Sequence, residues 1–527
     1  MATFSFKHPE LGEIRTHDYD GVLELLGLKY ASLEDRFAPA ELVEATSGES
    51  LDATKYGPQV LSPLQGIDIE RGLIQQALPN PEFPGVSDSN GLNLNITSPT
   101  GGSKLPVVVF IHGGAFGIGA NWYPHYDFKR LVRMSIEQGM PIIGITINYR
   151  LGAPGFLFSE EMREAGYLPN NGLRDQRVAL QWIKRFIAGF GGDPDNLTVM
   201  GHSAGGISTS YMLGSDEPLC KQLIIFGGSP PLLKPFPLEI AEHLYQQVTN
   251  ALGLGSLSAP DRVKALKQTD GAKLLEVTPM SVPLVPVVDD DIVKSVPNFE
   301  AVATKGSAGA CGAERQWCQA LIVGDSADDA SAFVMIHLMG RKAGIGSAFV
   351  AHVRNSLSSQ SSTAEALLRS YGLDGDVSDD DAAIRKLIKL GSDLNFFAPA
   401  VHFAAAFKGK SYVFHFNELN PWDGPMKGLA THILDVAFLF QNFNERLSEE
   451  QRSTAVQLGK DIISFVNGEA PWPPYNTENG AGVYAHGKRE YVTAAGSTGR
   501  EDTVFQLAEK AGLDQLLDVW QAFLFGV

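Results

Sequence analysis

Short apolar segments alternate with helical patterns along this 527-residue chain. Residues 92–96 (LNLNI) alternate between apolar and polar side chains, which predicts a strand with one exposed face. Residues 106–111 (PVVVFI) and 141–147 (PIIGITI) are almost entirely apolar, as are parallel strands that are covered on both faces. Strands of this kind between helices predict an α/β fold with a large, mostly parallel sheet.

Residues 175–190 (DQRVALQWIKRFIAGF) have the periodicity of an amphipathic helix. Gly191 and Gly192 follow this segment and predict its end. The acidic segment 374–381 (DGDVSDDD) predicts a helix start at Ser378 and the aspartates after it, because acidic side chains favour the positive end of the helix dipole. The apolar stripe of the first helix consists of Val178, Trp182, Phe186 and Phe190, with Ala179, Ile183 and Ile187 beside it.

The sequence contains no motif that predicts a metal or an organic cofactor. Residues 374–381 lack the glycine at the sixth position and the distal glutamate of a calcium loop. Residues 113–119 (GGAFGIG) lack the G-x-G-x-x-G spacing of a dinucleotide-binding loop. We therefore expect neither a metal nor a cofactor.

Ser203 lies in a short glycine-rich stretch, Gly201-His202-Ser203-Ala204-Gly205. The β-prone residues 197–200 (LTVM) precede it, and a segment that can form a helix follows. A serine at such a strand-to-helix turn is typical of a nucleophile elbow, where glycines allow a very tight turn. The alternative is an incidental serine in a glycine-rich turn.

A second glycine-rich loop follows the apolar segment 106–111. His112-Gly113-Gly114-Ala115 would bring backbone N–H groups close to a substrate, because glycine has no Cβ to obstruct the approach. Acyl transfer creates an oxyanion that needs such donors. We expect the N–H groups of Gly113, Gly114 and Ala204 to form this oxyanion hole.

These motifs resemble those of the type-B carboxylesterases, a family that includes the cholinesterases and related lipases. The resemblance implies an α/β-hydrolase fold over residues 1–527 as a single domain. It implies a large central, mostly parallel, twisted sheet with helices on both faces, and inserted helices and loops that form an active-site gorge. The most specific matching stretch is 170–206, and further similar stretches are 25–42, 148–157, 285–293 and 420–425.

The resemblance also indicates where a catalytic acid belongs. The family's acid lies in a G-x-x-x-[DE]-E-G turn after a strand, and counting from Gly324 gives Asp329. An aspartate then replaces the usual glutamate, with a side chain that is one methylene shorter. Asp328 and Asp325 remain alternatives.

His432 matches the family's catalytic histidine. Asp435 follows it after three residues, and Phe438 and Phe440 follow after six and eight, as in the family. The resulting order of serine, acid and histidine is that of α/β-hydrolases. We expect His337 to pack on an apolar helix and His415 to lie within a strand.

His202 stands next to Ser203, where many relatives carry glutamate. Adjacent side chains at an elbow point in different directions, so His202 is not expected to be the base. We expect it to contribute packing or local polar support, or to tune the pH response of the site.

The resemblance implies hydrolysis of a carboxylic ester through an acyl-enzyme, on a small to medium apolar substrate. A lactonase or an acyl transferase with the same triad is an alternative. A non-catalytic binding protein of the same fold is a further one, although such relatives typically lose the serine or the histidine. The candidate gorge residues are Phe116, Trp122, Tyr123, Phe226, Pro230, Leu232, Trp422 and Phe438.

Composition narrows the setting in which the protein acts. A net charge of −18 argues against nucleic acid as a partner, and no apolar run approaches the ~18 residues of a membrane span. The three cysteines, the absence of a signal-peptide pattern and Gly91, where secreted relatives carry a disulfide cysteine, predict a cytoplasmic protein resembling intracellular fungal members. Cys311 and Cys318 are expected to be free thiols, and the protein a monomer or a homodimer.

Overall fold

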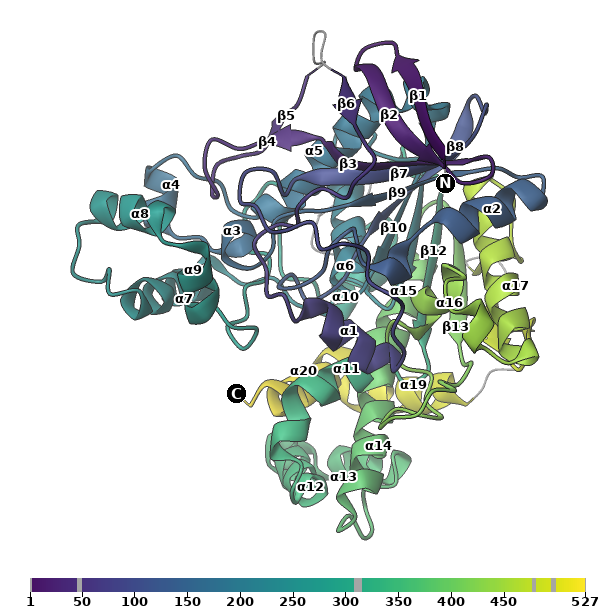
Figure 1. The fold of residues 1–527 in the computed structure, drawn as a ribbon. Helices are drawn as coiled ribbons and strands as arrows, with labels where there is room; N and C mark the ends of the chain where they lie inside the picture. The colour runs from purple at the N-terminus through teal and green to yellow at the C-terminus, as the bar shows by residue number, and fades with distance from the viewer. Residues whose placement is uncertain (1, 45–49, 308–314, 476–479, 494–498, 527) are drawn as a thin grey trace.

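The computed structural model describes residues 2–44, 50–307, 315–475, 480–493 and 499–526, so the predicted thiol of Cys311 lies outside the described residues. In the described residues thirteen strands form one sheet, and β4 (Ala31–Ser32) pairs with β5 (Glu41–Leu42) separately (Figure 1). The strands of the large sheet are β1 (Ala2–His8), β2 (Gly12–Asp18), β3 (Val22–Lys29), β6 (Leu51–Asp52), β7 (Asn93–Pro99), β8 (Leu105–Ile111), β9 (Ile143–Ile147), β10 (Gly192–His202), β11 (Gln222–Phe226), β12 (Ala320–Ser326), β13 (Lys410–Phe416), β14 (Gly480–Ala485) and β15 (Lys488–Thr493).

The sheet is parallel in its centre and antiparallel at both sides. Its order is β1-β2-β3-β7-β9-β8-β10-β11-β12-β13-β14-β15, with β6 beside β2. All neighbouring pairs from β9 to β14 run parallel. The pairs from β1 to β9 along this order, and β14 with β15, are antiparallel. The predicted mostly parallel sheet is therefore confirmed for its centre.

Helices cover both faces of the sheet. Val109 and Phe110 are consecutive in β8 and so point to opposite faces. Val109 belongs to a core that includes Trp182 of α5, whereas Phe110 belongs to a second core that includes Leu458 of α17. The helices are α1 (Gly66–Ile74), α2 (Lys129–Glu137), α3 (Gly152–Phe156), α4 (Glu160–Glu164), α5 (Asn171–Phe186), α6 (Ala204–Tyr211), α7 (Leu238–Ala251), α8 (Ala259–Gln268), α9 (Gly271–Val277), α10 (Phe299–Ala303), α11 (Ser331–Phe333), α12 (Ile345–Ser356), α13 (Ser361–Ser370), α14 (Asp380–Ser392), α15 (Ala398–Ala406), α16 (Leu434–Leu439), α17 (Glu449–Val466), α19 (Arg500–Ala511) and α20 (Leu513–Phe525).

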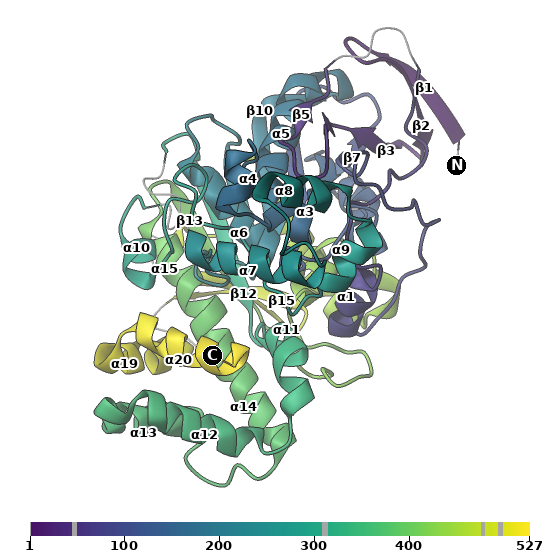
Figure 2. The same ribbon diagram turned by 90° about the vertical axis from the view of Figure 1, so that its left-hand side faces the viewer.

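Two groups of helices extend away from the sheet. Helices α7, α8 and α9 form one group, and α12, α13 and α14 form the other, with the C-terminal helix α20 beside it (Figures 1 and 2). None of the described helices has both the length and the apolar character needed to cross a membrane.

The structure refines three predicted elements. The strand expected at residues 92–96 exists as β7, but all of its residues are buried, because both of its faces are covered: Leu94 and Ile96 pack in the core that contains α5, and Asn95 on the other face donates to the carbonyl of Asn121. The predicted stripe helix is α5, which continues as a 3-10 turn to Phe190 and ends at Gly191 with φ 89°. Helix α14 begins in the acidic segment as predicted, but its N-cap is Asp379 rather than Ser378.

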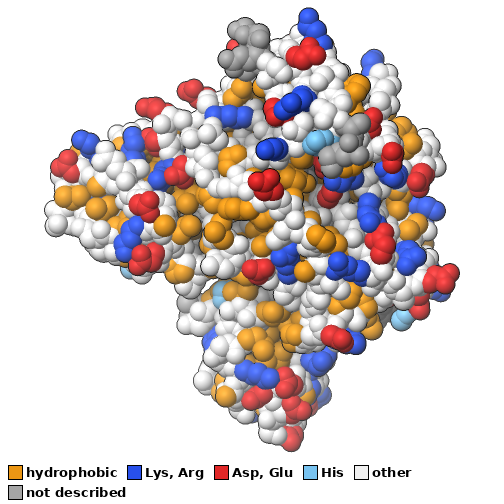
Figure 3. Space-filling model, viewed as in Figure 1, with side chains coloured by type: hydrophobic (Ala, Val, Ile, Leu, Met, Phe, Trp, Pro, Cys, Tyr) orange, Lys and Arg blue, Asp and Glu red, His pale blue; other side chains and the backbone are white. Residues whose placement is uncertain are grey.

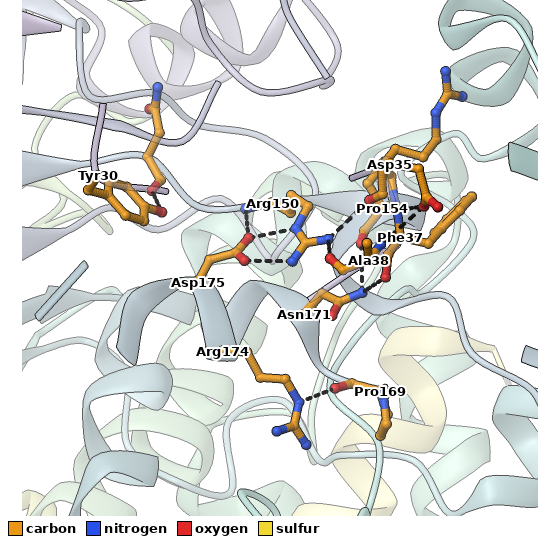
Figure 4. Close-up of polar contacts among 12 residues, drawn as sticks. Tyr30, Asp35, Phe37, Ala38, Arg150, Pro154, Pro169, Asn171, Arg174 and Asp175 are labelled. Atoms are coloured by element: carbon orange, nitrogen blue, oxygen red, sulfur yellow. Dashed lines mark hydrogen bonds and ion pairs between the residues drawn. The ribbon is translucent and has the colours of Figure 1, made fainter. Parts of the chain in front are cut away.

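A buried ion pair ties the N-terminal segment to the sheet and to α5 (Figure 4). Arg150 donates to Asp175 from Nε at 2.8 Å and from Nη2 at 2.6 Å, and its backbone N–H also donates to this carboxylate. Arg150 Nη1 donates to the carbonyl oxygens of Arg36 and Ala38. Arg150 and Asp175 lie in two of the stretches that resemble the family. These stretches therefore stabilise the fold, in addition to containing the serine motif.

Loss of one partner of this pair should destabilise the fold. In Asp175→Asn, the buried guanidinium of Arg150 would lose its charged partner, which should lower the free energy of unfolding by about 3–5 kcal/mol. The matched control is Asp52→Asn, which breaks a pair with Arg15 whose side chains are 49% and 52% exposed and should cost less than about 1 kcal/mol. Urea denaturation measures both variants, and equal costs would contradict the structural role of the buried pair.

Candidate active site

Ser203 occupies a strained turn between β10 and α6. Its backbone angles are φ 55° and ψ −123°, a combination that a residue with a side chain adopts only when its surroundings enforce it. The N–H of Ser203 donates to the carbonyl of Phe226 at 2.9 Å, and its carbonyl accepts from Ile207 at 3.0 Å. This is the strand, turn and helix predicted for the serine, and the side chain is half-buried.

The two glycines that flank the serine are required by close backbone contacts. A Cβ at Gly201 would lie 2.2 Å from the carbonyl oxygen of Gly205. A Cβ at Gly205 would lie 2.1 Å from the carbonyl oxygen of Ile111 at the end of β8. The turn at Ser203 is therefore packed directly against the start of the second glycine-rich loop.

That second loop brings Gly113 and Gly114 to the serine. A Cβ at Gly113 would lie 2.9 Å from Ser203 Cβ, and Gly114 has φ 97°. Ala115 and Phe116 also have positive φ values of 51° and 61°, so the loop holds a strained conformation. Within the described part of the chain, the N–H groups of Gly113, Gly114 and Ala204 donate to no other residue.

His432 and Asp329 form a buried pair. Nδ1 of His432 lies 2.8 Å from Oδ1 of Asp329, and the two residues are 5% and 1% exposed. The other carboxylate oxygen of Asp329 accepts from the N–H of Ser326 at 2.7 Å, and the N–H of His432 donates to Ser331 Oγ. Burial raises the pKa of the Asp329 carboxyl, while its hydrogen bond with His432 acts in the opposite direction.

The two alternative aspartates have other partners. Asp328 accepts from the N–H of Ala430 at 2.9 Å and forms a β-bridge with Thr431. Asp325 lies 2.6 Å from His415 Nδ1 and 2.9 Å from Arg500 Nη2. Of the three acids, Asp329 is the one that contacts His432.

A cavity of about 690 Å³ lies beside these residues. Its walls are mainly apolar and include Ala115, which directly follows Gly114, and Leu232, from the loop after β11. Phe333 also lines it and lies 5.7 Å from Phe396, whose ring is 5.5 Å from that of His432. The cavity thus lies next to the Gly113-Gly114 loop, and Ser203, His432 and Asp329 are not among its lining residues.

The aromatic residues predicted to line a gorge lie elsewhere. Six aromatic side chains were predicted to contact the substrate, and none of them lines the cavity. Each is packed instead into one of the two cores. Phe116 belongs to the core that contains α5, and the other five belong to the core that contains α17. Of the wider set, Leu232 lines the cavity and Pro230 does not. The residues in question are Phe116, Trp122, Tyr123, Phe226, Trp422 and Phe438.

Much of the cavity lining instead comes from two segments that the sequence did not point to. One is the loop after α9, residues 278–285, and the other is the end of α20. His337 packs on its helical segment as expected, with its ring 5.1 Å from that of Phe525, and it also lines the cavity. Apolar side chains cover much of the face between the two helical groups (Figure 3). The apolar residues near the C-terminus (QAFLFGV) were the sequence feature that could have indicated this wall of the cavity.

The charged residues around the cavity are few. Lys234 and Asp518 line it and form an ion pair of 2.6 Å with each other. In the described ranges no three His, Cys, Asp or Glu side chains lie together as ligands for a metal ion. The chemistry that the arrangement offers is that of the serine, the histidine–aspartate pair and the backbone N–H groups.

A methyl group at Gly205 should break the contact between the turn and β8. Gly205→Ala would place Cβ against a backbone carbonyl oxygen, and we expect the free energy of unfolding to fall by about 3 kcal/mol or more. The control is Gly72→Ala in α1, where a Cβ would meet nothing within 4 Å and stability should stay unchanged or rise slightly. Urea denaturation of both variants checks this, and a Gly205→Ala variant as stable as Gly72→Ala would refute the contact.

Known proteins similar to this chain include an esterase and a lipase. Para-nitrobenzyl esterase of Bacillus subtilis (strain 168) is 39% identical over 208 residues, which cover 39% of this chain and 39% of that protein. Lipase 4 of Diutina rugosa is 32% identical over 249 residues, which cover 43% of each protein. The matching stretches thus span about two fifths of the length of these curated relatives.

A solved structure of a PNB esterase has the same fold, with a TM-score of 0.73 and 24% identity over 94% of this chain and 98% of that one. This confirms the predicted α/β-hydrolase fold. A family model described as "Carboxylesterase family" matches residues 10–506. Because this match covers nearly the whole sequence, the chain belongs to the carboxylesterase family.

Proposed function

We propose that this protein hydrolyses a carboxylic ester, with Ser203 as nucleophile, His432 as general base and Asp329 as the acid that orients it. The observation that carries the proposal is the buried 2.8 Å contact between His432 Nδ1 and Asp329. It leaves Nε2 of His432 available to a serine hydroxyl. The family membership and the names of the relatives, an esterase and a lipase, support the same reaction.

The reaction begins when the Ser203 oxygen attacks the ester carbonyl. His432 accepts the hydroxyl proton at Nε2 and returns it to the departing alcohol, which leaves an acyl-serine. Asp329 holds the imidazole in the tautomer with Nδ1–H and stabilises the imidazolium. Water then attacks the acyl-serine, and His432 again accepts the proton.

The oxyanion of each tetrahedral intermediate needs donors that are in place beforehand. The N–H groups of Gly113, Gly114 and Ala204 fit this role, because they bind no other residue in the described structure and belong to the two loops that meet at Ser203. The strain at Ser203, Ala115 and Phe116 supports this assignment, since strained backbone of this kind clusters at active sites.

The substrate that fits the cavity is an uncharged, mainly apolar ester of small to medium size. A volume of about 690 Å³ lies within the range of small-molecule sites. Lys234 and Asp518, which line the cavity, form an ion pair with each other and leave no net charge to attract an ionic substrate.

Two variants and one control test the triad with a neutral 4-nitrophenyl ester. Ser203→Ala should lower kcat by about 10³–10⁶-fold, and Asp329→Asn by about 10⁴-fold, because an amide favours the wrong histidine tautomer. The matched control Asp328→Asn keeps a carbonyl oxygen for the N–H of Ala430 and should stay within about tenfold of the unsubstituted enzyme. A stronger effect of Asp328→Asn than of Asp329→Asn would assign the acid differently.

We also propose that the protein acts in the cytoplasm. A Cβ at Gly91, where secreted relatives carry a cysteine, would lie 2.7 Å from the carbonyl oxygen of Ser87, so this site is shaped for glycine. Cys220 is a buried thiol, and burial raises its pKa to about 12, which keeps it unreactive. Fractionation of cells that express the untagged protein should recover it in the cytoplasmic fraction, and recovery from the culture medium would contradict this.

A further inference from the structure

His202 lies between the proposed base and the proposed oxyanion loop. It is the last residue of β10, directly before Ser203, and only 2% of it is exposed. The ring centroids of His202 and His432 are 4.4 Å apart, with an angle of 41° between the rings. On its other side, Nδ1 of His202 would lie 3.0 Å from a Cβ at Gly113, so this nitrogen faces the loop.

Neither ring nitrogen of His202 has a hydrogen-bond partner in the described structure. A buried polar group without a partner costs roughly 1–3 kcal/mol, so its retention in a folded protein calls for an explanation. Packing alone would be served better by an apolar side chain. The position at the base therefore points to a role in the reaction.

The ring of His432 is fixed from several directions. Its Nδ1 contacts Asp329, one side of the ring contacts His202, and the ring of Phe396 lies 5.5 Å away at an angle of 60°. Two aromatic rings and one carboxylate thus set the orientation of the imidazole. Removal of the His202 ring would leave a space into which His432 could rotate.

The titratable groups around His202 come from several elements. Burial, and then the charges of His432 and His125, lower the pKa of His202 well below its ordinary value, so it is neutral. His125, in the turn after Tyr123, is hydrogen-bonded to Glu70 of α1 at 2.6 Å. The remaining groups of this region are His112 after β8, Asp329 after β12 and Asp435 of α16.

Two of those groups bear on the charge beside the base. Burial, and then the negative charge of Asp329, raise the pKa of Asp435 well above its ordinary value. Burial lowers the pKa of His112, which is therefore neutral as well. The carboxylate in direct contact with His432 is that of Asp329.

We propose that His202 is an uncharged positioning residue for His432. Its ring holds the imidazole of the base in place and adds no negative charge beside it. The free enzyme consequently keeps its base unprotonated at a lower pH than a carboxylate at position 202 would permit. This inference rests on the proposed Ser203–His432–Asp329 mechanism.

The sign of the effect follows from the charge at position 202. A carboxylate there would favour the protonated, positively charged form of His432, which cannot accept the proton of Ser203. The acid limb of the pH profile of kcat/KM would therefore move to higher pH. An opposite charge within ~4–6 Å shifts such a titration by about 1–3 pH units.

The first test compares two substitutions that differ only in charge. His202→Glu should move the acid limb of kcat/KM upward by about one pH unit or more, whereas His202→Gln should leave it within about 0.3 unit. The control is His243→Glu on the exposed face of α7, which replaces a histidine by a glutamate far from the site and should not move the acid limb. An unmoved limb in His202→Glu, or an equal movement in His202→Gln, would overturn the proposal.

The second test introduces no charged side chain into the buried site, so it can be carried out even if His202→Glu fails to fold. His202→Phe keeps a ring against His432 and should retain kcat at alkaline pH within about threefold, whereas His202→Ala should lower kcat by about tenfold with little change in KM. Equal kcat values for the Phe and Ala variants would overturn the positioning role. An unsubstituted enzyme that hydrolyses no ester would instead refute the proposed function, and the inference with it.

Discussion

The arrangement of the site depends on the contact between the end of β8 and the start of α6. The parallel pairing of β8 with β10 sets Ile111 opposite Gly201, so the segments that follow these two strands leave the sheet at the same edge. Gly205 then approaches the carbonyl of Ile111 so closely that no side chain fits between them. This contact holds the turn at Ser203 against the loop with Gly113, where a Cβ at Gly113 would lie 2.9 Å from Ser203 Cβ.

Asp329 and His432, the proposed acid and base, come from distant parts of the chain and meet by the same principle. β12 ends at Ser326 and Asp329 follows in the next turn, while His432 precedes α16. Carboxyl ends of neighbouring parallel strands meet at one edge of a sheet, which is where such folds carry their sites. Asp329 reaches His432 despite its short side chain, and the N–H of Ser326 holds its second oxygen.

The parts of the structure that the sequence predicted are those in which the backbone restricts the residue type. The glycines around Ser203 and in the loop at Gly113 allow the backbones of these two segments to approach each other closely. The glycine spacing in the sequence therefore indicates the geometry of the turn. The choice among Asp325, Asp328 and Asp329 could not be made from spacing alone. It depends on which carboxylate finds a backbone N–H, an arginine or a histidine, and these partners come from other elements.

The cavity could not be predicted, because an aromatic side chain has the same sequence signature in a core and in a gorge. Trp122 and Phe438 are buried in the core on the α17 side, whereas Met280 and Phe525 form the walls of the cavity. Which apolar residues stay uncovered depends on how the loop after α9 and helix α20 pack, and this is a property of tertiary contacts.

Covalent labelling distinguishes a nucleophile at Ser203 that its surroundings activate from an ordinary serine in a glycine-rich turn. The native protein is treated with a fluorophosphonate, and its mass and the modified peptide are determined. One adduct per chain is expected, located on Ser203 in the folded protein and absent after denaturation or in His432→Ala. An unmodified native protein, or an adduct on another residue, would argue against a nucleophilic role for Ser203.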